Sequence, residues 1–553
     1  MSDSTFRGSK DLQEINFKMD QLIANRDKAS ILEYLKELEG IKFSSSKLQS
    51  SFYYALGNGY SAIVDDFKEC WSQDSIGNAV RNYRRAMYEA DFSKLPASII
   101  SSVYANFGNA LCRQGRSAEG VLEFDRALNH SNNAIATLCK GKSLLDLSRR
   151  IVDSDTAMQF QRQAYELLSY AYKSKNELFD SDHVEYMDAD RDATGFIAWY
   201  REHLDVINQE CPPISELKSR TGKTVQEQKY MSWAVKNRLY LNVLNDISTE
   251  PYCAQDSLSF PSTMHNTNPL VNVTDSLAIR SAFTEIKYQY AAARYSYFNA
   301  ITSRTAKKET LHFSDENLFL TNSLDYCIYR KDIEEIKCVF KSLYSCFDKI
   351  AFLLRTYLKI DGPVHRVDFK RIWNTNSDNI KDRFANSNNS FLLALYWLSR
   401  EIVEDEENGH GYWIDPNAKS LAEIRNAIEH RGFRVIYDFS KTARDMEKRH
   451  GDRAYIKIKK ELSSLIELLN TEEDKDKKGA LILRIEHIKE CIAEKKSLEG
   501  YPLTISDDEL RSQTLRLMHK VRYSLSYLAM AIAVEEKKIK VPDIVVSFET
   551  PLT

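Results

Sequence analysis

The chain has 553 residues, of which 43% are hydrophobic and 28% charged, and its formal net charge is −3. This length exceeds what one ordinary hydrophobic core holds, and the composition excludes an intrinsically disordered chain. A nearly balanced charge does not fit a protein that coats polyanions over its whole surface, although it leaves room for a local basic pocket for RNA or nucleotide.

The N-terminal residues, MSDSTFRGSKDLQEINFK, contain no apolar signal core, and the longest apolar run, at 527–534, is far shorter than a bilayer span. The nine cysteines include no CxxC pair, which argues against a zinc ribbon or a disulfide scaffold and favours a reducing compartment. We therefore expect a cytoplasmic protein with no membrane contact, no metal site and no cofactor.

Helical repeats are predicted for residues 1–210. The segment 101–132 has small and large residues at the offsets of the tetratricopeptide repeat, in which small residues let paired helices approach closely. These residues are Tyr104, Phe107, Gly108, Leu111, Gly115, Gly120, Phe124 and Ala127. A unit with a longer connection precedes it at 52–87, and a degraded third unit covers 137–173. Such an array would bind a peptide or partner protein on its concave surface, or serve only as a helical spacer.

Residues 211–276 form a predicted connecting segment. Five prolines and the polar run PSTMHNTNP indicate loops in this part of the chain. The segment is not an empty linker, because KYMSWAVKNRLYLNVLNDI at 229–247 is aromatic and periodic.

Apolar residues recur at three- and four-residue steps in the remaining segments, which predicts a helical bundle over 277–553. The long helical segments lie at 278–301, 334–360, 390–405, 420–431 and 509–538. The charged residues 440–500 predict an exposed helical hairpin inserted into this bundle. The predicted fold class is therefore all-α, with tetratricopeptide-like helical repeats followed by a bundle that carries a helical hairpin. A central β-sheet would contradict it.

The stretch EIRNAIEHRG at 423–432 raises the question of function. Ser420 and Glu423 have capping-box spacing, so a helix can begin there, unless it begins earlier at the Asp-Pro pair at 415–416. Gly432 suits a left-handed C-terminal cap. The expected buried residues of this helix are Leu421, Ile424 and Ile428.

Its polar residues lie on more than one face. Arg425 and Glu429 are four positions apart and could form a surface ion pair, and Asn426 and His430 have the same spacing on an adjoining face. Arg425 and His430 are five positions apart, about 140° around the helix. A site that uses both must rely on the length of arginine or on a second helix.

Arg-Asn followed by three residues and His resembles the R-x4-6-H signature of HEPN domains (higher eukaryotes and prokaryotes nucleotide-binding). The segments KYMSWAVKNRLYLNVLND, DSLSFPS and EIKYQYAAARYSYF are similar to the middle part of a prokaryotic HEPN family with a tetratricopeptide-like N-terminal region. The resemblance covers most of the chain. It implies a metal-independent ribonuclease, and a homodimer whose active site forms where two bundles pair across a symmetry axis.

These residue types suit RNA cleavage by the RNA's own 2′-hydroxyl. His430 can move a proton near neutral pH, and Arg425 can hold charge on the phosphorane. Asn426 would orient a phosphate or the histidine, whereas Glu429 would take part or only hold Arg425. The predicted substrate-binding residues are Arg431 and Arg434.

The leading interpretation is an endoribonuclease that acts as a toxin or an anti-phage defence effector. One alternative is a protein that binds RNA or nucleotide without cleaving it, and another is a scaffold that uses only its repeats. Arg444 and His450 also satisfy an R-x5-H spacing, but the run between them has a single apolar residue, so we rank this pair well below Arg425 and His430.

Overall fold

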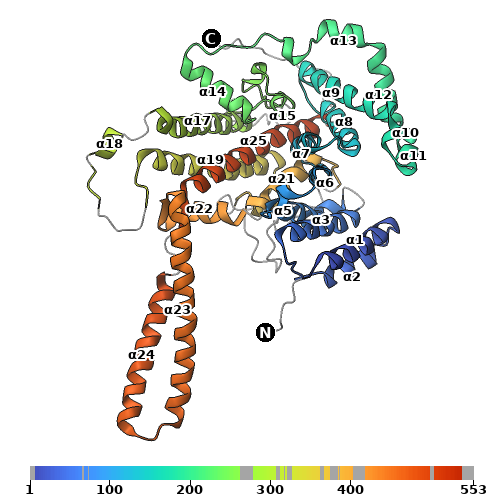
Figure 1. Cartoon of the computed structure of the whole chain (residues 1–553). Coiled ribbons are helices and arrows are strands. Elements are labelled where there is room, and N and C mark those ends of the chain that lie inside the picture. The colour runs from blue at the N-terminus through green and yellow to red at the C-terminus, as the bar shows by residue number, and fades with distance from the viewer. Residues whose placement is uncertain are drawn as a thin grey trace. The chain divides into compact units, whose positions relative to one another are not determined.

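The computed structural model describes residues 7–64, 68–72, 74–261, 278–306, 312–316, 318–320, 327–360, 367–373, 384, 386–402, 418–498 and 503–538, and the account of side chains omits 303–306, 418–420, 441–445, 447–451 and 496–498. The described residues are almost wholly helical, which confirms the predicted all-α class (Figure 1). None of the helices in these ranges combines the length and the apolar character that a membrane crossing requires.

The chain divides into two compact units, each assembled from separate stretches. The first consists of Met1–Ala291, Ser345–Lys419 and Met518–Thr553, and the second of Ala292–Tyr344 and Ser420–Leu517. Three long helices therefore belong partly to each unit: α17 (Ala278–Ala306), α19 (Lys331–Leu358) and α25 (Asp507–Lys537). The domain boundaries expected at 210 and 276 stay predictions.

The first unit begins with a series of helix pairs. These helices are α1 (Ser9–Ala24), α2 (Lys28–Glu37), α3 (Ser46–Ala62), α5 (Ser75–Tyr88), α6 (Ala97–Arg113), α7 (Ser117–His130), α8 (Ala134–Ser148) and α9 (Ser154–Lys173). α3 packs with α5, α6 with α7, and α8 with α9. The longer connection expected between the first two contains α4 (Glu69–Ser72).

The contact between α6 and α7 in this series is built on two glycines. A Cβ atom at Gly108 would lie 2.8 Å from the ring of Phe124, and one at Gly120 would lie 2.5 Å from the sulfur of Cys112. α6 and α7 can therefore pack this closely only because both positions lack a side chain. The small residues at these two repeat positions do what the sequence pattern predicts.

Shorter elements follow the repeats. They are α10 (Lys175–Leu178), α11 (Ser181–Ala189), α12 (Arg191–Glu202), α13 (Leu204–Glu210), η2 (Ile214–Glu216), α14 (Val225–Lys236), α15 (Leu244–Ile247), η3 (Pro251–Cys253) and η6 (Arg371–Trp373). From 211 to 261 the predicted connecting segment alternates short helices with loops, as its prolines indicate, whereas most of the polar run PSTMHNTNP lies outside the described residues.

α21 (Ser390–Ile402) also lies in the first unit and is almost entirely buried. The indole nitrogen of Trp397 donates to the backbone carbonyl of Cys70 at 3.0 Å, and the ring of Tyr396 stacks on Trp71 with ring centroids 5.4 Å apart. α21 therefore packs against α4, in the connection between α3 and α5 of the same chain.

Glu401, on the last turn of α21, anchors this arrangement. Its carboxylate accepts hydrogen bonds from Arg84 of α5 and from Lys520 of α25, each at 2.6 Å, and it also accepts from Arg116. Glu401 and Arg116 are fully buried. Burial by itself would raise the pKa of the Glu401 carboxyl, but the charges of Arg116, Arg84 and Lys520 hold that pKa well below its usual range.

The second unit contains a small β-sheet that was not predicted from the sequence. Its strands are β1 (Phe433–Ile436) and β2 (Leu503–Ser506), which run parallel with Phe433 opposite Leu503. Four residues are too few for a period-two pattern to stand out, and the two strands are paired across a crossover of more than sixty residues. The sheet is not central, so the all-α class holds. The other elements of this unit include α18 (Phe313–Glu316) and α22 (Ala418–His430).

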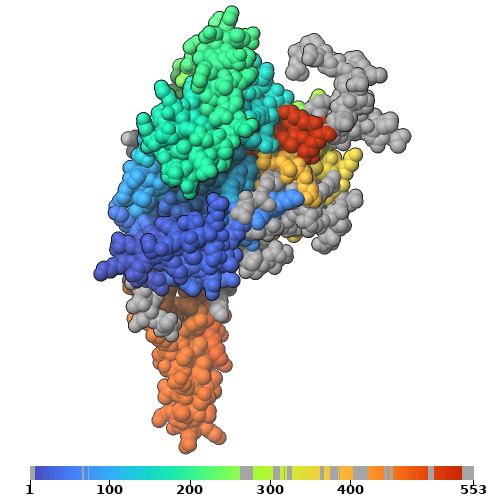
Figure 2. Space-filling model, turned by 90° about the vertical axis from the view of Figure 1, so that its right-hand side faces the viewer, coloured from blue at the N-terminus to red at the C-terminus, as the bar shows by residue number. Residues whose placement is uncertain are grey.

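The crossover between the strands is the helical hairpin, formed by α23 (Asp438–Thr471) and α24 (Lys475–Leu498), which lie side by side (Figures 1 and 2). Its apolar seam consists of Ile458, Leu462, Leu465 and Leu469 on α23 and Leu481, Ile485, Ile488 and Ile492 on α24. Both sets follow the four-three-four spacing of a coiled-coil seam. The predicted hairpin is confirmed, and it begins directly after β1.

Candidate functional site

α22 presents one apolar face and one polar face, as its sequence predicts. Leu421, Ile424 and Ala427 are buried, whereas Ile428 is only half-buried. Ala427 thus takes the place expected for Ile428 in the buried stripe. The helix begins at Ala418, so Ser420 lies inside it and is not its N-cap, which corrects the expected capping box. The alternative start at 415–416 lies outside the described residues.

The helix ends because the chain enters a strand. The carbonyl of Gly432 accepts a hydrogen bond from the backbone N–H of Leu503 at 2.9 Å, which starts the β1–β2 ladder. Among the described residues, the glycines with a positive φ are Gly40 and Gly115. The left-handed cap expected at Gly432 is therefore wrong, and the chain continues from the end of α22 directly into the β1–β2 pairing.

Four polar side chains gather on the solvent side of the last turns of α22. The Nε atom of Arg425 lies 3.0 Å from Oε2 of Glu429, and its Nη1 donates to Oδ1 of Asn426 at 3.0 Å. The Nε2 atom of His430 lies 3.6 Å from the same Glu429 oxygen, which is longer than a good hydrogen bond. One carboxylate oxygen therefore stands between the guanidinium and the imidazole.

This geometry shows how Arg425 and His430 come together although they start about 140° apart on the helix. The arginine side chain is long enough to bend along the helix surface to Glu429, which sits one position before His430. The guanidinium and the imidazole thus both approach Glu429 within one chain, through the length of arginine.

The cluster is open to solvent. The side chain of His430 is 66% exposed, while those of Arg425 and Glu429 are 33% and 29% exposed. The Cζ atom of Arg425 lies 5.6 Å from the ring centroid of Tyr344 on α19, so an aromatic ring supports the guanidinium. The sequence reading missed Tyr344, because it belongs to the periodic pattern of a distant helix and carries no local signal.

The two predicted substrate-binding arginines follow α22 directly. Arg431 is exposed and continues the polar end of the helix. Arg434 is half-buried on β1, where the sheet places it opposite Thr504. The sheet therefore sets the backbone position of Arg434 relative to the end of α22.

The described side chains contain no group of three or more His, Cys, Asp or Glu residues that could hold a metal ion. The lower-ranked pair, Arg444 and His450, falls on α23, and both side chains lie outside the described ones.

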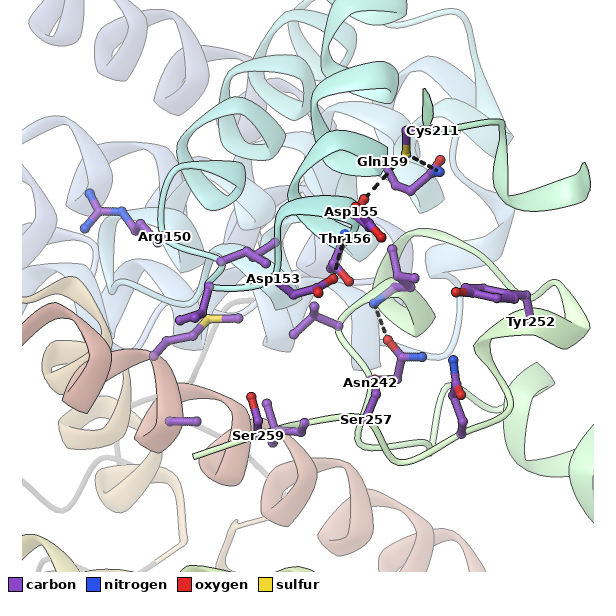
Figure 3. A pocket seen from close by; sticks show the side chains of 18 of the residues that line it. Arg150, Asp153, Asp155, Thr156, Gln159, Cys211, Asn242, Tyr252, Ser257 and Ser259 are labelled. Carbon is purple, nitrogen blue, oxygen red and sulfur yellow. Dashed lines mark hydrogen bonds between the residues drawn. The ribbon is translucent and has the colours of Figure 1, made fainter. Parts of the chain in front are cut away.

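A recess of about 370 Å³ lies in the first unit, between the start of α9, the connecting segment and α25 (Figure 3). Three carboxylates line it, from Asp153, Asp155 and Glu210. Asp153 is already engaged as the cap of α9, where it accepts from the backbone N–H of Thr156 at 2.8 Å. This acidic lining repels phosphate, so the recess is a poor candidate for binding RNA.

Residues 271–471 match the family model described as LA2681-like HEPN. This match supports a HEPN-family protein. The matched range includes α22 with Arg425 and His430, and a HEPN domain suggests a ribonuclease or a nucleotide-binding function. Comparisons with curated proteins and with solved structures gave no match. The HEPN match does not include the N-terminal helix pairs. The likeness of these pairs to tetratricopeptide repeats therefore rests on their sequence pattern and on how the helices pair.

Proposed function

We propose that this HEPN protein is a metal-independent endoribonuclease, in which the 2′-hydroxyl of RNA attacks the adjacent phosphorus. The proposal rests on one observation above all. Arg425 and His430 converge on a single Glu429 oxygen at an exposed helix end, where a polyanion can reach both.

His430 supplies the proton transfer. Its imidazole takes the proton of the 2′-hydroxyl as the bond from the 2′-oxygen to phosphorus forms, and the bond from phosphorus to the 5′-oxygen breaks. The leaving 5′-oxygen needs a proton in return. The products are a 2′,3′-cyclic phosphate and a 5′-hydroxyl. General acid–base help of this kind is worth typically about 10²–10⁴-fold in rate.

One imidazole cannot give and take a proton in the same step. A second His430, from another copy of the chain, would be the general acid for the leaving oxygen. This requirement supports a homodimer that pairs two α22 ends across a twofold axis, since an isologous contact needs only one self-complementary patch. Light scattering on an active preparation at micromolar concentration tests it, and a monomeric mass would contradict the pairing.

Arg425 stabilises charge on the phosphorane through its planar set of donors. Without RNA, its partners are Glu429 and Asn426. An exposed ion pair is worth only about 0–1 kcal/mol, so a phosphate can replace Glu429 at small cost. Glu429 and Asn426 then act as positioning residues that hold the guanidinium ready.

Arg431 and Arg434 would contact phosphates that flank the cleaved bond. Phosphate contacts set the register of an RNA strand without reading its sequence. For the biological role we propose a toxin or anti-phage effector with a sensing repeat region, on the strength of the family resemblance.

The deciding experiment incubates the purified protein with total RNA, with and without EDTA, and analyses the chemistry of the new ends. We expect cleavage in both conditions and 2′,3′-cyclic phosphate ends. Cleavage that requires a divalent ion would refute the mechanism. RNA binding without cleavage would identify the protein as a non-catalytic member of the HEPN class.

A further inference from the structure

A groove of about 520 Å³ lies in the first unit, between the end of α2, α3 and α5. Leu35, Phe52 and Leu56 form apolar parts of its lining, and Lys42, Asn82 and Arg85 form polar ones. The three apolar residues are buried, so the groove has an apolar floor. It is therefore amphipathic, which suits a ligand with both a charged and an apolar group.

Lys42 and Arg85 are two of the three cationic residues that line the groove, beside Arg81, and these two have no acidic partner among the described residues. The Arg85 guanidinium donates to the phenol oxygen of Tyr53 at 2.5 Å and lies over that ring, with Cζ 3.8 Å from the centroid. No carboxylate in the described part of the chain pairs with Arg85 or with Lys42. Glu39 also lines the groove, but it leaves the balance positive. An anionic ligand is favoured.

Asn82 adds to the groove a hydrogen-bond acceptor to which no described group donates. This residue is 4% exposed, and its Nδ2 atom donates to the backbone carbonyl of Asn78 at 2.9 Å. Its Oδ1 atom is buried and has no hydrogen-bond partner in the described structure. A buried polar atom without a partner is unfavourable, so a ligand N–H that reaches this oxygen would strengthen binding.

We infer that this groove binds an acidic segment of a partner protein. A carboxylate of that segment pairs with Arg85 and Lys42, a backbone N–H donates to Asn82, and a neighbouring apolar side chain packs on Leu56. RNA fits less well, because single-stranded RNA needs an open aromatic face and the guanidinium of Arg85 already covers Tyr53.

The groove is distinct from the part of the repeats that contacts α21. α5 serves both regions: Arg84 donates to Glu401 of α21, whereas Asn82 and Arg85 line the groove. A partner can therefore bind here while α21 stays in place. This inference does not rest on RNA cleavage.

The test applies the full-length protein to an array of random ten-residue peptides that span net charges from acidic to basic. We expect binding to increase with the number of Asp and Glu residues, most strongly where an apolar residue is adjacent. Asn82→Leu and Arg85→Gln should each weaken the acidic peptides at least tenfold. Arg191→Gln, at an exposed position of α12 that does not line the groove, is the matched control.

Asn82→Leu separates binding from folding, because replacing an unsatisfied amide by an apolar group of similar size leaves stability unchanged or raises it. Lys42→Ala, at an exposed position, provides a second variant that does not disturb the core. The inference fails if acidic peptides show no preference, or bind all variants equally. It also fails if a labelled single-stranded oligonucleotide, rather than a peptide, shows the Arg85-dependent binding.

Discussion

Two clusters in this molecule share one design and differ in burial. In the first unit, the Glu401 carboxylate forms ion pairs with Arg84, Arg116 and Lys520, and its side chain is 0% exposed. In the second unit, Glu429 stands between Arg425 and His430, and its side chain is 29% exposed. Each is a single carboxylate surrounded by nitrogen-bearing basic side chains. The buried Glu401 carboxylate cannot exchange its partners. The more exposed Glu429 carboxylate can release the Arg425 guanidinium, which an incoming phosphate would then bind.

Because the two clusters differ in their contact with water, they contribute differently to the free energy of unfolding. Breaking a buried ion pair leaves a charge without water or partner and costs about 3–5 kcal/mol, whereas an exposed pair contributes about 0–1 kcal/mol. Glu401 thus ties α21 to the repeats, and Glu429 stabilises little. If the comparison is right, substitutions in the exposed cluster change activity without stability, and those in the buried cluster change stability first.

The largest effect should come from the catalytic pair. His430→Ala and Arg425→Ala should each reduce RNA cleavage by at least about 10²-fold, because each removes a group that the proposed mechanism uses in the transition state. The melting behaviour should stay within about 1 kcal/mol of wild type, as expected for polar residues outside the core. Initial rates on a labelled RNA measure the loss.

The double variant of this pair should be little worse than either single one, since groups that act as a unit are strongly non-additive. Arg444→Ala and His450→Ala are the controls and should retain activity. Full activity in both Arg425→Ala and His430→Ala, with normal folding, would place the site elsewhere.

Glu401→Ala should cause the largest loss of stability, about 3–5 kcal/mol in the free energy of unfolding, because it removes the buried carboxylate that Arg84, Arg116 and Lys520 share. Unfolding followed by tryptophan fluorescence is a suitable measurement, since Trp397 and Trp71 both lie at α21. Glu429→Ala is the matched control and should change stability by about 1 kcal/mol or less. Equal losses in the two variants would contradict the comparison.

The spacing of residues within single helices and repeats predicted much of this fold. The features that it did not predict are contacts between residues far apart in the sequence. The offsets of Gly108 and Gly120 placed two glycines where α6 and α7 meet, because helix pairing within a repeat depends on residues a few turns apart. The seam of the hairpin followed in the same way from its heptad spacing.

Glu401, on α21, and Arg116, just before α7, meet across 285 positions of the chain, and neither stands out in its local sequence. Tyr344 reaches Arg425 in a similar way, from another helix. Such contacts depend on how elements assemble, which periodicity does not encode. The motif EIRNAIEHRG identified the candidate residues, but the place of Glu429 between Arg425 and His430 needed the rotamers of all three side chains.

The buried cluster also predicts a pH dependence. Because its cationic partners hold the pKa of Glu401 well below the usual 4.5, the folded chain keeps this carboxylate ionised where the unfolded chain protonates it. Its stabilising effect is therefore complete above pH 4.5 and declines as the pH falls through that value, by about 1.4 kcal/mol per unit. The difference in unfolding free energy between wild type and Glu401→Gln should shrink accordingly.

Unfolding curves of both proteins at pH 7 and near pH 3.5 measure this difference. Groups distant from Glu401 titrate alike in both proteins, so their contributions cancel in the comparison. A gap of the same size at both pH values would show that the carboxylate charge is not what stabilises α21.

The smallest effects should come from the residues that position Arg425. Glu429→Gln keeps the shape of the side chain but removes the charge that holds the guanidinium, so we expect a loss of about tenfold in kcat with little change in KM. Asn426→Ala removes one weaker bond to Arg425 and should cost only a few-fold. Glu429→Asp retains the charge on a shorter side chain and should recover part of the rate. A loss in Glu429→Gln as large as that in His430→Ala would instead make Glu429 a direct participant in proton transfer, and the exposed cluster would then owe its activity to all three groups.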